Sequence, residues 1–193
     1  MAKTVGFIGS GNMGRAIMGG MIAAGLYAPS QILASAKTKE TVEKIEKELG
    51  IVATTDNATV AKKADILFLA VKPGVFATVI PEIRDCCKEG QIVVSIAAGQ
   101  TLTSITELFG HEIKLVRAMP NTPAFVGEAM SAVTPNNHVG EDEIQEVMAI
   151  FESFGKAEIV PETMMDAVIG VSGSSPAYVY MFIEAMADAA VAD

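Results

Sequence analysis

Short apolar runs alternate with amphipathic segments over residues 4–118. We expect strands at Val5–Ile8, Gln31–Ala34, Ile51–Thr54, Asp65–Val71, Gln91–Ile96 and Lys114–Ala118. The continuous apolar run within Asp65–Val71 is typical of a strand that is buried on both faces of a parallel sheet. Helical patterns fill the intervals at Asn12–Ala24, Lys39–Leu49, Asp56–Lys63, Val75–Cys87 and Leu102–Phe109. This alternation predicts an α/β fold built on a doubly wound parallel sheet.

The pattern changes after Ala118. The two prolines of Met119–Pro123 disfavour both helix and central strand, so we expect a rigid loop there. Beyond it the sequence predicts an edge strand at Glu128–Pro135, an amphipathic helix at Glu141–Phe154 and a last strand at Lys156–Val160. From Glu162 onward the chain is helical and unusually apolar. We therefore expect one domain over residues 1–160 and the start of an all-α domain over residues 161–193.

A glycine-rich segment follows the first predicted strand. Gly9, Gly11 and Gly14 form the spacing G-x-G-x-x-G where that strand meets the first helix. The first glycine permits a tight turn, the second lets a pyrophosphate approach the backbone, and the third lets the helix close onto the sheet. The helix N-terminus also offers free N–H groups to phosphate. The segment predicts a dinucleotide site in a Rossmann-type fold, with a purely structural glycine turn as the alternative.

The end of the second predicted strand bears on which dinucleotide binds. NAD-binding units carry an acidic residue about 20 positions beyond the glycines, where it holds the 2′-hydroxyl of the ribose. Here the strand end contains Ser35, Lys37 and Lys39, and no carboxylate precedes Glu40. A hydroxyl and two ammonium groups favour a 2′-phosphate, so we expect NADP(H) ahead of NAD(H). The alternative is that the lysines only form the solvated start of a helix.

Three further loops follow predicted strands and are expected at the same edge of the sheet, where ligands bind in open α/β folds. They are Val71–Pro73, Ile96–Gly99 and Met119–Pro123. The small residues of the second loop leave room for a flat nicotinamide ring. Lys72 is either a cofactor contact or a solvated strand end, and Asn121 either orients a substrate or is an ordinary turn residue.

The segment Ser172–Tyr178 begins the last predicted helix. Ser175 and Pro176 are typical of a helix start, and the serines at this N-terminus either bind a substrate carboxylate or only cap the helix. The helix Ala177–Val191 is apolar on nearly every face, so it must be buried by more chain or by a partner subunit. We therefore expect self-association through this helix.

Composition excludes several classes of protein. The net charge of −9 and the lack of a basic run beyond Lys62-Lys63 argue against a nucleic-acid partner. The adjacent Cys86 and Cys87 are expected to be free thiols in a reducing compartment. No signal peptide is expected, and no apolar stretch is long enough to span a bilayer, so we expect a soluble cytoplasmic protein. The isolated His111 and His138 lack metal-ligand spacing, so no metal site is expected.

Taken together, the sequence closely resembles pyrroline-5-carboxylate reductases over its whole length. The resemblance is carried by Gly6–Met13, Phe68–Pro73, Ser95–Gly99, Arg117–Pro123, Gly170–Tyr178 and Phe182–Ala185. The segment Gly170–Tyr178 is the most specific of these. The resemblance implies hydride transfer from NAD(P)H to the C=N carbon of 1-pyrroline-5-carboxylate, which gives L-proline, the last step of proline biosynthesis.

The resemblance also assigns site residues, although it names no catalytic group or proton donor. The implied cofactor contacts are Ile8, Gly9, Ser10, Gly11, Asn12, Met13, Ser35, Lys37, Asn57, Ala70, Val71, Lys72, Pro73, Ala97 and Ala98. The implied substrate contacts are Asn121, Ser172 and Ser174. The residues from 161 on would begin a dimerisation and substrate domain, which implies a homodimer or higher homo-oligomer.

Two departures from the family are expected to matter. Ser175 stands where the family usually has glycine, and the family continues for several more helices, so we expect a C-terminally truncated member. Two alternative functions stay open. One is a β-hydroxyacid dehydrogenase, although the helix Ala177–Val191 lacks the lysine that such enzymes place after the cofactor domain. The other is a cofactor-binding module without turnover.

Overall fold

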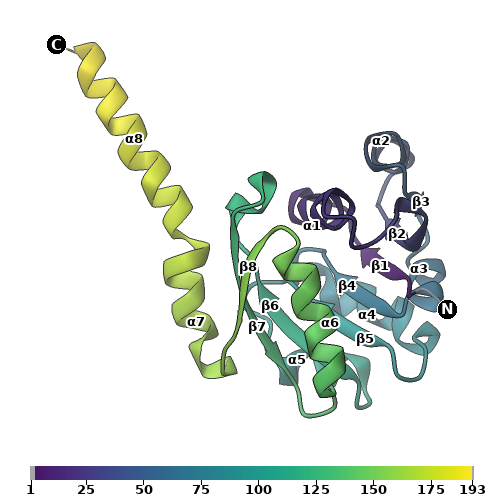
Figure 1. The fold of residues 1–193 in the computed structure, drawn as a ribbon. Coiled ribbons are helices and arrows are strands. Elements are labelled where there is room, and N and C mark those ends of the chain that lie inside the picture. Colours follow the sequence, from purple (N-terminus) through teal and green to yellow (C-terminus); the bar gives the residue numbers. More distant parts are fainter. Residues whose placement is uncertain (1–2, 193) are drawn as a thin grey trace.

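An eight-stranded sheet forms the centre of the molecule (Figure 1). The structure, a computed structural model, describes residues 3–192. Its strands are β1 (Val5–Ile8), β2 (Ile32–Ser35), β3 (Val52–Thr54), β4 (Ile66–Leu69), β5 (Ile92–Ser95), β6 (Lys114–Met119), β7 (Ala129–Pro135) and β8 (Gly155–Ile159). Their order across the sheet is β3-β2-β1-β4-β5-β6-β7-β8. The reversal of strand order beside β1 is the feature of a doubly wound sheet, which confirms the predicted fold class.

The sheet is parallel from β3 through β6 and reverses at β7. β7 pairs antiparallel with β6, and β8 pairs parallel with β7. The prediction that Glu128–Pro135 forms an edge strand is therefore wrong, because β8 covers its outer side. Pro135 is the last residue of β7, so its missing N–H interrupts little of the ladder.

Helices cover both faces of the sheet and enclose a separate apolar core on each. One face carries α1 (Asn12–Ala23), α2 (Lys39–Leu49) and α6 (Glu141–Glu152), and the other carries α3 (Asn57–Lys63), α4 (Phe76–Ile83) and α5 (Leu102–Phe109). Alternate residues of the strands point to the two cores. On the first face Phe7 and Phe68 stack with ring centroids 4.7 Å apart, and Phe151 of α6 closes over Phe68.

Two local predictions need correction. The helix expected over Val75–Cys87 is divided, because α4 ends at Ile83 and a 3₁₀ turn, Arg84–Cys86, follows. The loop expected at Met119–Pro123 is partly regular, since Met119 still belongs to β6 and Thr122–Val126 form a 3₁₀ helix. Proline disfavours the interior of an α-helix but suits the first position of a 3₁₀ turn, as Pro123 shows near the start of this one.

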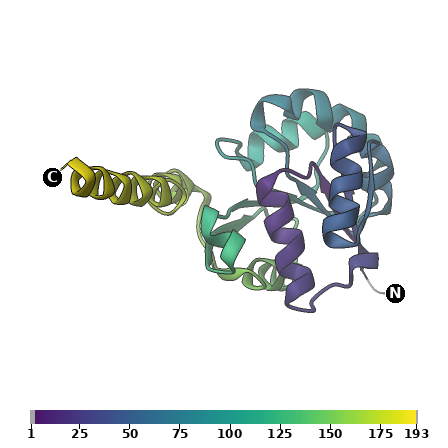
Figure 2. The ribbon, with the colours of Figure 1, turned by 90° about the horizontal axis from the view of Figure 1, so that it is seen from above.

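The segment after β8 forms a helical arm that leaves the body of the molecule (Figures 1 and 2). It contains a 3₁₀ turn at Glu162–Met164, α7 (Met165–Val168), a π-helical turn at Ile169–Gly173 and α8 (Ser175–Ala192). From Ala177 on, every described residue of α8 is exposed, although most of them are apolar. Within residues 3–192, no helix combines the length and the apolar character needed to cross a membrane.

Candidate functional site

The backbone of the glycine loop explains why glycine stands at each position of the motif. Gly9 has φ +93°, and a Cβ there would lie 2.6 Å from Val71 Cγ1 and 2.8 Å from the carbonyl oxygen of Ala70. At Gly11 a Cβ would meet none of the described atoms of the rest of the fold within 4 Å. The loop is therefore packed tightly at its first glycine and open at its second, which leaves space for a ligand against the backbone.

The N-terminus of α1 faces that open space. Gly11 is the N-cap and provides no side-chain cap, and the first turn of the helix contains no acidic residue. The first N–H groups of a helix need partners from outside the helix, and the positive end of its dipole favours an anion. The geometry thus fits a phosphate of a dinucleotide at Asn12 and Met13.

Two serines fix the glycine loop to the end of β2. The hydroxyl of Ser10 donates to the carbonyl oxygen of Ser35 at 2.9 Å, and the Ser35 hydroxyl accepts the Gly9 N–H at 3.2 Å. Ser35 also bonds to Asn57 Oδ1 at 2.7 Å. Ser35 is only 1% exposed, so its hydroxyl is engaged within the protein, whereas Lys37 is exposed beside it.

A pocket of about 430 Å³ lies next to these groups. It is lined by Gly9, Ser35, Ala36, Lys37, Thr55, Asn57, Val71, Val75, Thr78, Val79 and Glu82. Its apolar side comes from the loop after β4 and from α4, and its polar side comes from the ends of β2 and β3. An apolar wall for a ring and a lysine at the rim fit an adenosine that carries a 2′-phosphate.

The loops after β4 and β5 lie at the same edge of the sheet, as predicted. The Ala70 N–H donates to the Ile8 carbonyl at 2.9 Å, and the Ile96 N–H donates to the Leu69 carbonyl at 3.4 Å, so each loop continues the ladder of its neighbour. Lys72 is the N-cap of a 3₁₀ turn that starts at Pro73. In the loop after β5, Ala97 is buried and Ala98 is exposed.

The three predicted substrate residues lie in or beside the π-helical turn of the arm. Asn121 Oδ1 accepts the Met130 N–H at 2.9 Å, and its Nδ2 donates to the Ser172 carbonyl at 3.2 Å. The Ser174 hydroxyl donates to the Ile169 carbonyl at 2.9 Å. These bonds supply partners to carbonyls of the π-helical turn, a geometry that is frequent at functional sites. The assignment of these residues to substrate stays a prediction.

A partly buried ion pair joins the arm to the sheet and was not expected from the sequence. Arg117 of β6 is 5% exposed and contacts Glu162 Oε1 at 3.0 Å, while the same oxygen accepts the N–H of Leu102 at 2.8 Å. The pair ties the first residue of the arm's 3₁₀ turn to the sheet and to the start of α5. An arginine within an apolar strand was the one signal that the sequence offered.

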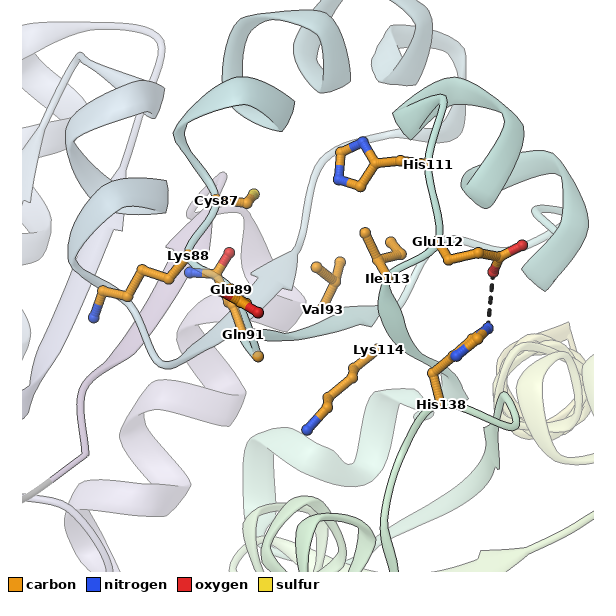
Figure 3. A pocket seen from close by; sticks show the side chains of 11 residues that line it. Cys87, Lys88, Glu89, Gln91, Val93, His111, Glu112, Ile113, Lys114 and His138 are labelled. Atoms are coloured by element: carbon orange, nitrogen blue, oxygen red, sulfur yellow. Dashed lines mark ion pairs between the residues drawn. The ribbon is translucent and has the colours of Figure 1, made fainter.

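A second hollow, of about 440 Å³, lies at the opposite edge of the sheet, between the segments that lead into β5 and β6 (Figure 3). It holds both histidines, and His138 Nε2 lies 2.9 Å from Glu112 Oε2. Burial raises the pKa of Cys87 to about 11, with a smaller contribution from Cys86, so this thiol is a poor nucleophile. Residues 3–192 contain no cluster of three or more histidine, cysteine or acidic residues suited to a metal ion.

Each of the two parts of the chain matches a known protein family. Residues 4–99 match a family described as NADP oxidoreductase, coenzyme F420-dependent, and residues 162–193 match one described as pyrroline-5-carboxylate reductase dimerisation. The pyrroline-5-carboxylate reductase of Escherichia coli is 50% identical over 99% of this chain and 71% of that protein. The one of Methanosarcina acetivorans is 40% identical over 98% of this chain and 70% of that protein.

Solved structures agree with these relatives. A pyrroline-5-carboxylate reductase from Coxiella burnetii superimposes with a TM-score of 0.91 at 33% identity, over 98% of this chain and 71% of that one. The NADP-bound pyrroline carboxylate reductase of Plasmodium falciparum gives 0.89 at 32% identity, over 98% and 69%. With a glycine loop, an arm that matches the dimerisation family and relatives of this identity, the chain belongs to the pyrroline-5-carboxylate reductase family.

Proposed function

We propose that this chain binds NADP(H) and reduces 1-pyrroline-5-carboxylate to L-proline. The reduced nicotinamide supplies a hydride to the C=N carbon of the ring, and the ring nitrogen gains a proton. The chain's own residues bind the dinucleotide, orient its nicotinamide and hold the substrate against it. The family membership and its NADP-bound member support this assignment.

One observation carries the proposal. The uncapped N-terminus of α1, the loop with Ala97 and Ala98, and the Asn121–Ser172 contact all follow strands at the carboxyl edge of the sheet. This arrangement supports positions for phosphate, nicotinamide and substrate that would follow one another along this edge. The glycine-loop residues Ile8–Met13 would hold the pyrophosphate, and Lys37 would meet the 2′-phosphate.

The test follows NADPH oxidation by the purified chain with 1-pyrroline-5-carboxylate as substrate. Oxidation that depends on this substrate, and NADPH binding that is tighter than NADH binding, are expected. A β-hydroxyacid serves as the control substrate with NADP⁺, and turnover of that acid alone would contradict the proposal. NADPH binding without any turnover would leave a cofactor-binding module.

We further propose that α8 mediates homo-oligomerisation. Its exposed side chains include Tyr178, Phe182 and Ile183, each more than half exposed, on a helix that has no acidic residue in its first turn and no basic residue in its last. Contiguous exposed apolar side chains of this kind mark an interaction surface. Light scattering is expected to detect dimers or larger species, and a monomer at all concentrations would contradict the proposal.

We also propose a cytoplasmic location, because Cys86 and Cys87 are free thiols. Cell fractionation tests this location.

A further inference from the structure

A continuous series of hydrogen bonds joins the glycine loop to the outer side of α4. The Gly9 N–H donates to Ser35 Oγ at 3.2 Å, and Ser35 Oγ lies 2.7 Å from Asn57 Oδ1. Asn57 Nδ2 then donates to Glu82 Oε2 at 2.8 Å. The four residues come from β1 and its loop, the end of β2, the start of α3 and the last turn of α4. Glu82 thus lies at the end of a path to the loop that receives the pyrophosphate.

The carboxylate of Glu82 determines the direction of this series. An ionised carboxylate only accepts hydrogen bonds, so it selects the amide nitrogen of Asn57 and turns Oδ1 toward Ser35. The Ser35 hydroxyl must then donate to Oδ1, which leaves a lone pair of its oxygen for the Gly9 N–H. Hydrogen bonds that run in one direction and end on a charge reinforce one another.

The alternative arrangements are weaker. If the Asn57 amide turned over, its NH₂ group would face the Ser35 hydroxyl, whose next acceptor, the carbonyl of Phe7, is 3.4 Å away. Gly9 itself holds φ +93°, a backbone conformation that is kept in place by the bond to Ser35. A loop that must hold such a conformation gains affinity for its ligand from being fixed in advance.

We propose that Glu82 is a positioning residue for cofactor binding, which acts through Asn57 and Ser35 to hold the glycine loop ready for the dinucleotide. The inference rests on the proposed NADP(H)-dependent function. Glu82 also lines the pocket of about 430 Å³ that fits an adenosine. A direct contact with the adenine amine is therefore the competing role that the experiment must separate.

The test measures the dissociation constant of NADPH by its fluorescence, without substrate. Glu82→Ala is expected to weaken binding about fivefold, because a hydrogen bond to a charged acceptor is lost at a solvent-exposed position. Glu82→Gln keeps an acceptor oxygen and is expected to remain within about twofold of the unmodified chain. In the Asn57→Ala background, Glu82→Ala is expected to have no further effect, because the two residues act in series.

Three results would overturn the inference. They are unchanged binding in Glu82→Ala, an equal loss in Glu82→Gln, and an undiminished effect of Glu82→Ala in the Asn57→Ala background. Reduced nicotinamide hypoxanthine dinucleotide phosphate lacks the adenine amine, so a Glu82→Ala effect that disappears with this cofactor would show a direct contact instead. Melting temperatures identify variants that fail to fold. Because no turnover is measured, failure of the proposed reaction would leave this result interpretable.

Discussion

The two edges of the sheet differ in how their polar groups are used. At the amino edge Lys88 pairs with Asp65 and Lys114 with Glu143. His138 lies against Glu112 there (Figure 3). At the carboxyl edge the glycine loop presents backbone N–H groups without a side-chain cap, next to Ala36 and Lys37. The pocket at this edge, about 430 Å³, is no larger than two hollows at the amino edge, about 440 and 570 Å³.

The candidate site is therefore marked by polar groups without a partner in the described part of the fold, such as the first N–H groups of α1, rather than by the volume of a hollow. In a doubly wound fold the helices that follow parallel strands all begin at the carboxyl edge, so their positive dipole ends converge there. At the amino edge, Lys88 pairs with Asp65 and Lys114 pairs with Glu143, so these charges already have partners of opposite sign. Variants at the two edges should therefore separate cofactor binding from stability.

The largest effect is expected at Gly11. Gly11→Ala should weaken NADPH binding at least tenfold, since its methyl group would occupy the space open to the pyrophosphate, while the melting temperature stays unchanged. Gly9→Ala is the matched comparison. It should also lower the melting temperature, because φ +93° and contacts of 2.6 and 2.8 Å cost about 1–3 kcal/mol. Calorimetry and fluorescence titration check both variants, and equal melting temperatures of the two would contradict the explanation.

A smaller and more selective effect is expected at Lys37. Lys37→Gln should weaken NADPH binding about fivefold and leave NADH binding unchanged, because in the proposed site its exposed ammonium would contact only the 2′-phosphate. The difference should shrink as salt is added. Lys39, the other lysine considered from the sequence, begins α2 and does not line the pocket, so Lys39→Gln is the control and should change little. If NADH binding fell as much as NADPH binding, Lys37 would have another role.

A change of a few-fold is expected where the arm begins. Asn121→Ala should lower kcat/KM for 1-pyrroline-5-carboxylate about fivefold without changing NADPH affinity, because the amide connects β7 to the π-helical turn. Ser172→Ala is expected to be milder, since Asn121 contacts the backbone carbonyl at 3.2 Å and the hydroxyl only at 3.5 Å. Steady-state kinetics measure both. An equal loss in Ser172→Ala would instead indicate that the hydroxyl contacts substrate.

The smallest effect is expected at the amino edge, and on stability alone. Burial raises the pKa of Asp65, but the Lys88 ammonium and the Thr4 N–H outweigh it and hold that pKa below its usual range. The ionised form therefore stabilises the fold above about pH 4, and this contribution is lost as the pH falls through the lowered pKa. Asp65→Asn should remove less than about 1 kcal/mol at neutral pH and flatten the acid side of the stability curve, as thermal denaturation across pH would measure. Altered NADPH affinity in this variant would contradict the comparison of the edges.

Most of the sheet and the glycine loop were predictable from sequence because their signals are local. Apolar runs such as Ile66–Leu69 and the spacing of Gly9, Gly11 and Gly14 depend on residues that are close along the chain. The interior position of β7 was not predictable in this way. It depends on β8, which comes later in the chain, and single-strand patterns do not reveal which neighbour a strand will gain.

The candidate site shows the same division. Ser35 and Asn57 were expected near the cofactor, but nothing along the sequence connects Ser35 with Asn57, 22 positions later, or Asn57 with Glu82, a further 25 positions on. Arg117 and Glu162 are separated by 45 positions, so their pairing was equally hidden. Such contacts form only when helices and strands pack.

The alternation of strands and helices, the position of the glycine loop and the apolar character of the arm follow from the sequence, because neighbouring residues encode backbone conformation and periodicity. Which polar groups bond to one another follows only from the packing of the fold. It turned the hydroxyl of Ser35 inward to Gly9 and Asn57, left the amides of α1 open, and placed the amide of Asn121 against the arm. The physical reason is that hydrogen bonds require proximity in space, and proximity between distant segments is a property of the packed fold.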